Sequence, residues 1–147
     1  MLSAVKIKRM GFFFTLQQFS AFGLLALRIA IGAIFWVHGT AKWAMWRTPP
    51  SAQMPSGMLR LMKILSIAEP VGALMLAAGF LTQIAAAGLG VIMLGALYFK
   101  IRAWKIPFTA QDKTGWEFDL MILAGAIALL FLGGGAWGLD QLLKRTF

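Results

Sequence analysis

Charged residues divide the chain into long apolar segments, and this pattern predicts membrane-spanning helices. Between Lys63 and Lys100 lie 36 residues with a single charge. A stretch of that length is too long for one span of about 20 residues and is suited to two. Positions 120–139 form a further uncharged stretch of 20 residues, and positions 10–37 carry one cation. The pattern therefore predicts four spans.

We expect helices over residues 19–39, 64–81, 84–99 and 118–132, with helical ends that run past the hydrocarbon. The short link at positions 81–83 makes the second and third helices an adjacent antiparallel hairpin. The apolar runs are continuous and rich in Leu, Ala and Gly, whereas strands of a β-barrel alternate. The predicted fold is an all-α integral membrane protein, an antiparallel bundle of four transmembrane helices formed by one domain over residues 1–147, with no internal repeat.

Composition supports lipid as the solvent of this chain. Hydrophobic residues make up 60% of 147 positions, with a mean hydropathy of +0.78. A soluble domain of this size cannot bury so much apolar surface. Lys6, Lys8 and Arg9 precede apolar residues as in a signal peptide, but no small-residue cleavage site follows. We therefore expect residues 1–39 to belong to the mature chain.

The net charge of +9 indicates contact with lipid headgroups rather than nucleic acid. The cations lie beside the spans and form no basic face with interleaved aromatic residues. With four spans, both termini share one side. That side holds five cations and the other side eight, which favours termini outside. The expected location is an integral protein of the bacterial inner (cytoplasmic) membrane.

Residue counts exclude several kinds of chemistry. The chain has no cysteine and one histidine, so it lacks thiolate ligands for metals or iron–sulfur clusters and a histidine pair for haem. No phosphate-binding loop motif is present. We expect no metal site, no covalently bound cofactor and no intrinsic enzymatic activity. A redox role requires a diffusible carrier such as a quinone, or a partner subunit.

The first predicted helix places most of its polar groups on one face. At about 100° per residue, Arg28, Gly32, Phe35, Gly39 and Lys42 share that face, with the histidine close by. A buried charge on a membrane helix turns towards neighbouring helices, since its exposure to acyl chains costs several kcal/mol or more. The two glycines allow a partner helix to approach closely there.

Glu69 is the carboxylate that these bases are expected to meet. It lies near the start of the second span, just before Pro70, which favours a bend or a helix start. An anion in hydrocarbon must pair with a cation or take up a proton. Arg28, His38 and Lys42 are the available partners, with Arg28 expected nearer the opposite leaflet. Two interpretations stay open, a structural ion pair between helices and a polar pocket at the end of the bundle.

Each polar residue also has a structural interpretation. His38 suits a hydrogen bond at a helix C-terminus, and Lys42 suits a contact with lipid headgroups. Glu117 and Asp119 begin the last span, where carboxylates offset the helix dipole. We expect these two residues, with Arg28, to be structural intramembrane charges.

Three motifs, taken in order, resemble the DoxX family of small four-span membrane proteins. The first helix reads LALRIAIGAIFWVHGTAKW, similar to the family's arginine, glycine, histidine-glycine and lysine pattern. The second helix reads EPVGALMLAAGFLTQIAA, with the family's glutamate, glycine-rich helix and short turn. Near the C-terminus, GGGAWGLDQLL resembles a glycine-rich segment that closes on Ser-Leu-Asp. Gly138 replaces that serine, and Asp140 is expected to cap the turn. The resemblance covers residues 24–143.

The resemblance implies a four-helix bundle and an association with redox physiology. Family members act as, or are similar to, membrane subunits of thiosulfate:quinone oxidoreductase or of oxidative-stress complexes. On this basis we expect a membrane subunit that supports quinone-linked redox chemistry of a partner complex. An apolar slot with hydrogen-bond donors suits a quinone. The expected site residues are His38 and Lys42 as donors, Glu69 as proton acceptor, and Phe35, Trp36 and Trp43 as lining.

Two other function classes stay open at this point. A structural accessory subunit of a respiratory or photosynthetic membrane complex would use the same polar cluster only to lock its helices. A small transporter or channel would need a continuous polar path from Arg28 to the His38 end.

Overall fold

The computed structural model describes residues 16–111 and 113–146, and all regular structure in these ranges is helical. Five α-helices follow one another: α2 (Ser20–Ala41), α3 (Ser56–Ala78), α4 (Thr82–Tyr98), α5 (Trp116–Leu132) and α6 (Leu139–Thr146). Shorter turns flank them: the 3₁₀ helices η1 (Gln17–Phe19) and η2 (Lys42–Arg47), and the π-helical η3 (Phe99–Ala103). The signal-peptide question and the cations Lys6, Lys8 and Arg9 lie outside the described residues.

Within the described part of the chain, three helical segments are long and apolar enough to cross a membrane. They are Gln17–Arg47, Ser56–Ala78 and Thr82–Ala103, so α2 and α4 gain length from their flanking turns. Helix α5 has 17 residues, at the short end of the range of about 17–25 for a span. An integral membrane protein built of helices is therefore established.

Helix boundaries lie within about three residues of the expected helix ends except at the start of α3. That helix begins at Ser56 rather than at residue 64. Consequently Pro70 lies inside α3 and does not begin it. Proline interrupts the backbone hydrogen-bond ladder of a helix, so its place inside a membrane helix requires compensation, which the site described below provides.

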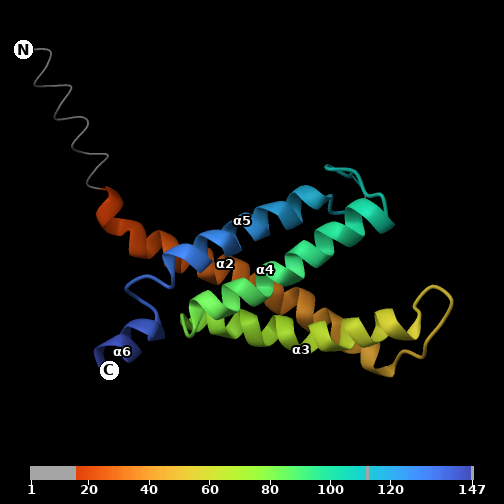
Figure 1. Ribbon diagram of the computed structural model, residues 1–147, viewed down its shortest axis with the longest axis horizontal. Helices are drawn as coiled ribbons and strands as arrows, with labels where there is room; N and C mark the ends of the chain where they lie inside the picture. Colours follow the sequence, from red (N-terminus) through yellow and green to blue (C-terminus); the bar gives the residue numbers. More distant parts are fainter. Residues whose placement is uncertain (1–15, 112, 147) are drawn as a thin grey trace, which may run out of the picture.

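The long helices pack as two hairpins. Helix α2 lies along α3, and α4 lies along α5. Contacts of α3 with α4, and of α2 with α5, join the hairpins. Figure 1 shows the two hairpins diverging towards the connections 48–55 and 104–115. Gly32 and Gly39 face α3, as predicted: a Cβ at Gly32 would lie 3.0 Å from the carbonyl oxygen of Ala73, and one at Gly39 would collide with Pro70.

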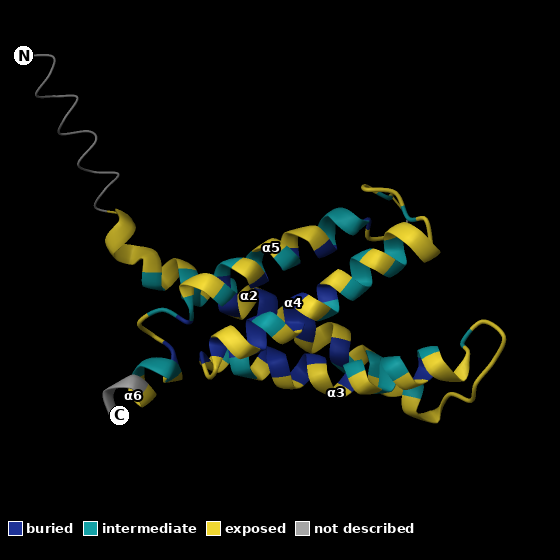
Figure 2. Cartoon of the chain, viewed as in Figure 1, coloured by how far each residue is buried: buried dark blue, intermediate teal, exposed yellow. Residues whose placement is uncertain are grey.

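The apolar core lies where the hairpins cross. Its buried side chains include Ile31, Phe35, Leu76, Leu89 and Leu129, from all four long helices. Figure 2 shows this buried region near the crossing of α2, α3 and α4, with exposed residues on the outer faces of every helix. Those outer faces are rich in Ile, Leu, Val and Phe, as expected of surfaces that contact acyl chains.

Candidate functional site

The bases of α2 and the acid of α3 meet at one end of the first hairpin. Lys42 Nζ lies 2.5 Å from Glu69 Oε2. The side chain of Glu69 is 4% exposed and that of Lys42 is 19% exposed. Lys42 Nζ also donates to the backbone carbonyl of His38 at 3.0 Å. Of the three predicted partners of Glu69, the structure thus brings Lys42 into contact.

Two tryptophans that follow Lys42 donate hydrogen bonds to Ser66, which lies four residues before Pro70. Proline has no N–H to donate to the carbonyl four residues earlier, which here belongs to Ser66. Trp43 Nε1 donates to that carbonyl at 2.9 Å, and Trp46 Nε1 donates to the Ser66 hydroxyl at 2.9 Å. Because η2 continues α2 as a 3₁₀ helix, both indoles turn back onto α3. A side chain from the neighbouring helix therefore satisfies the carbonyl that the proline frees.

The remaining predicted site residues separate from this cluster. His38 is exposed, and its ring lies 6.2 Å from the ring of Phe118 in α5, measured between centroids. Phe35 is buried in the apolar core, while Trp36 is exposed on the outer face of α2. Hence His38, Lys42, Trp36 and Glu69 mark the same end of the first hairpin, and Phe35 lies deeper.

A second ion pair closes the second hairpin at the same end of the molecule. Lys100 Nζ, in η3, lies 2.5 Å from Asp119 Oδ2 in α5, and both side chains are largely buried. Gly115 caps α5 without a side-chain hydrogen bond. Glu117 and Asp119 occupy the first turn, as expected for residues that offset the helix dipole. Asp119 in addition pairs with Lys100 of η3, the helical turn that continues α4.

The opposite end of the molecule holds the buried arginine. Arg28 is 0% exposed, and its Nη2 donates to the carbonyl of Trp137 at 3.2 Å. Asp140 accepts hydrogen bonds from the backbone N–H groups of Leu81 (2.7 Å) and Thr82 (3.0 Å). It therefore caps the start of α4. Arg28 lies away from Glu69, as the helical rise predicted.

Gly138, which stands where the family pattern has serine, lies in a tight place beside Arg28. A Cβ there would lie 3.0 Å from the Gly79 carbonyl oxygen and 3.1 Å from Arg28 Nη1. Gly79 has a φ of 65° and would direct a Cβ into the Arg28 guanidinium. Only glycine suits such a left-handed position without strain. The arginine thus packs between two glycines.

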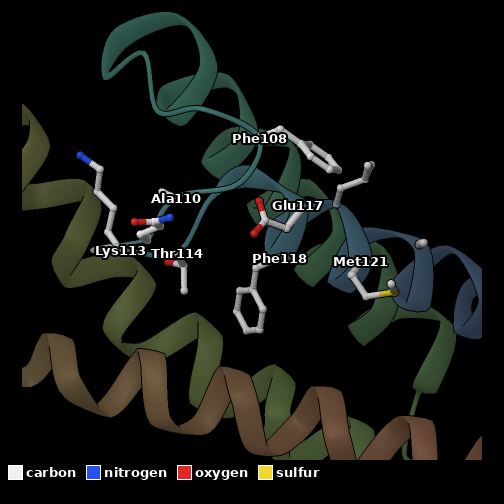
Figure 3. Close-up of a pocket in the computed structure, with 10 residues that line it drawn as sticks. Phe108, Ala110, Lys113, Thr114, Glu117, Phe118 and Met121 are labelled. Carbon is white, nitrogen blue, oxygen red and sulfur yellow. The ribbon is translucent and has the colours of Figure 1, made fainter.

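A pocket of about 930 Å³ opens beside α5, away from the predicted site residues except Glu117. It lies under the connection that precedes α5 (Figure 3). Its lining residues are Phe108, Ala110, Gln111, Lys113, Thr114, Glu117, Phe118, Leu120, Met121 and Ala124. Phe118, which lines this pocket, is also the residue whose ring lies beside the ring of His38. Among the described residues, no group of three or more His, Asp or Glu residues is placed to hold a metal ion.

Sequence reasoning missed Ser66, Lys100 and Phe118. Ser66 lies four residues before Pro70, so the freed carbonyl was a usable signal. Lys100 gave no signal beyond its position at the end of a span, where contact with lipid headgroups is common. Phe118 was one aromatic residue among many.

The fold and the paired charges define a small helical membrane protein whose hairpins are closed by buried ion pairs. The family model described as DoxX matches residues 23–101, more than half of the chain, and the chain belongs to this family. An uncharacterized protein of Haemophilus influenzae is 30% identical over 128 residues, covering 86% of this chain and 94% of that protein. No solved structure matches the chain.

Proposed function

We propose that this DoxX-family protein is a four-span subunit of the bacterial inner membrane that supports quinone-linked redox chemistry of a partner complex. The four long helices would cross the bilayer as an antiparallel bundle. Support for the fourth span comes from α5, which packs along α4 and is apolar from Leu120 to its end. The family resemblance supplies the redox association.

The observation that carries the redox role is the position of Lys42 and His38. Lys42 is held by Glu69 and by the His38 carbonyl, yet its side chain keeps 19% exposure. The exposed imidazole of His38 lies one helical turn earlier. Two hydrogen-bond donors at a bundle end, beside aromatic Trp36 and Trp43, suit the carbonyl groups of a quinone. On this proposal Glu69 accepts the accompanying proton through Lys42.

The test begins with purification of the full chain from its native membrane in mild detergent, with identification of the partner chains. Quinone-dependent turnover of that complex is then measured with His38→Ala and with Tyr98→Phe as a control, since Tyr98 is exposed on α4. We expect at least about a tenfold loss for His38→Ala, as for loss of a positioned donor, and none for the control. Unchanged turnover together with absence of bound quinone contradicts the redox role.

A structural accessory subunit is the second candidate, and a specific observation favours it. Lys42 and Glu69 neutralise each other within the chain, and the indoles of Trp43 and Trp46 are engaged by Ser66. Such contacts lock α2 to α3 without any ligand. On this alternative, Glu69→Gln lowers the amount of assembled complex, while turnover per complex stays unchanged.

A further inference from the structure

Glu117 places a carboxylate inside the pocket beside α5, and the chain provides it with little solvation. Its Oε2 is buried and has no hydrogen-bond partner among the described residues. Its backbone N–H donates to the Phe108 carbonyl at 3.2 Å, which folds the connection over the start of α5. Gly115 packs against both groups so closely that a Cβ there would collide with them. The carboxylate is therefore held in a fixed position.

Among the residues that the structure describes, no cation forms an ion pair with this carboxylate. Lys100 is paired with Asp119. The Lys113 side chain lines the pocket, but in Figure 3 its ammonium group points away from Glu117. Glu117 is one of the residues that line the pocket, so a ligand bound there lies beside its carboxylate. An under-solvated acceptor of this kind gains more than a surface carboxylate does from a bound donor.

Gln111, Lys113 and Thr114 add polar groups to the pocket from the connection before α5, and the wall that α5 itself supplies beyond Glu117 is apolar. Glu117, Leu120, Met121 and Ala124 share one face of α5 at helical spacing. Glu117 lies between the side chains of Phe108 and Phe118 in the view of Figure 3. Leu120 and Met121 are exposed, so the apolar wall continues into the surface that faces acyl chains. A ligand can enter from the membrane with its hydrocarbon tail along α5.

We propose that this pocket binds an uncharged membrane amphiphile whose headgroup carries a hydroxyl that donates to Glu117. A phosphate headgroup is disfavoured because it would lie against the carboxylate. Quinols and diacylglycerols are the two membrane sources of this chemistry. The site is distinct from His38 and Lys42, and the proposal stands without the redox role.

The test measures equilibrium binding of tritiated ligands to the full-length chain in phosphatidylcholine nanodiscs. One arm uses a decyl-tailed hydroquinone and a second uses dioleoylglycerol. The matched ligand is the dimethyl ether of the same hydroquinone, which keeps ring and tail but has no donor. We expect the wild type to bind the hydroquinone about tenfold more tightly than the ether, the size expected for a hydrogen bond to a charged group.

Two variants and a control isolate Glu117. Glu117→Met removes the acceptor at similar volume and is expected to abolish the preference for the hydroquinone over the ether, whereas Glu117→Gln is expected to reduce it. Tyr98→Phe, outside the pocket, is expected to keep it in full. A wild type that binds neither donor ligand, or binds ether and hydroquinone equally, overturns the proposal, as does a Glu117→Met variant that keeps the preference. Because no partner complex is used, this result is independent of turnover in the His38→Ala complex.

Discussion

At the residue scale, the indole of Trp43 compensates for the backbone hydrogen bond that Pro70 removes from α3. The proline leaves the Ser66 carbonyl without its usual donor, and the indole N–H supplies one at 2.9 Å. An unsatisfied carbonyl inside a protein costs about 1–3 kcal/mol. This contact explains how α3 continues through a proline at membrane depth.

We therefore predict that Trp43→Phe destabilises the protein by about 2 kcal/mol, because the Ser66 carbonyl loses its donor. In a Pro70→Ala background the restored backbone N–H can serve that carbonyl, so the same change should cost less than half as much. Unfolding in mixed micelles, followed by circular dichroism, measures both values in a double-mutant cycle. Equal costs in the two backgrounds would show that the indole acts only through packing.

The Lys42–Glu69 pair has unequal partners, and this leads to a second prediction. Lys42→Met leaves a carboxylate with a 4% exposed side chain unpaired, whereas Glu69→Gln leaves an ammonium with 19% exposure that can reach headgroups. Loss of one partner of a buried pair costs about 3–5 kcal/mol. We expect Lys42→Met to lower the free energy of unfolding by about 3 kcal/mol. Glu69→Gln should lower it clearly less. The same micelle unfolding assay checks the order, and a reversed order would contradict it.

At the element scale, the first turn of α6 and the segment before it contact the turn between α3 and α4. Asp140 accepts from two backbone N–H groups at the start of α4, and its own N–H donates to the Gly79 carbonyl at 2.9 Å. Arg28 reaches the same segment through the Trp137 carbonyl. The C-terminal motif thus connects α2, the turn and α4.

The third prediction concerns Asp140. Asp140→Ala removes both capping acceptors and should cost about 1–2 kcal/mol, the range for loss of a helix cap. Asp140→Asn keeps one acceptor oxygen, so the stability of this variant should lie between that of Asp140→Ala and that of the wild type. Gln141→Ala, at the adjacent position, is the control and should change stability little. If Asn and Ala cost the same, the carboxylate acts through its charge near Arg28 rather than through the cap.

Sequence patterns predicted these elements better than the contacts between them. Exclusion of ions from lipid was enough to predict that Glu69 meets a base of α2, because few partners exist at that depth. The choice of Lys42 over His38 depends on η2, whose 3₁₀ turn has no distinctive sequence signal. Lys100 reaches Asp119 through the π-helical η3, a geometry that hydrophobic spacing does not encode. The Glu117 pocket depends on the irregular connection 104–115.

At the scale of the whole molecule, the two hairpins are closed by ion pairs of the same kind. In each, a lysine just after the first helix pairs with a carboxylate in the second, Lys42 with Glu69 and Lys100 with Asp119. Both pairs lie at the end where the hairpins diverge in Figure 1. No repeat was evident in the sequence, because the spacing between lysine and carboxylate differs between the hairpins. Each hairpin is therefore closed by an ion pair of its own at that end.

The last prediction tests whether α5 completes a fourth span. Because the chain has no cysteine, single cysteines can report sidedness. With four spans, Ser51→Cys and Thr109→Cys lie on one side of the membrane and Ala136→Cys lies on the other. All three positions are exposed. The larger number of cations on the connections 48–55 and 104–115 and their flanks predicts that this side is the cytoplasmic one.

Labelling with a membrane-impermeant maleimide should therefore modify Ala136→Cys in intact spheroplasts, and Ser51→Cys and Thr109→Cys only after lysis. A fourth span separates Thr109 from Ala136, whereas three spans leave them on the same side. If both label together, α5 lies along the membrane rather than across it, and the pocket beside Glu117 would then face headgroups instead of acyl chains. The outcome thus decides which surface of α5 a hydrocarbon tail can reach.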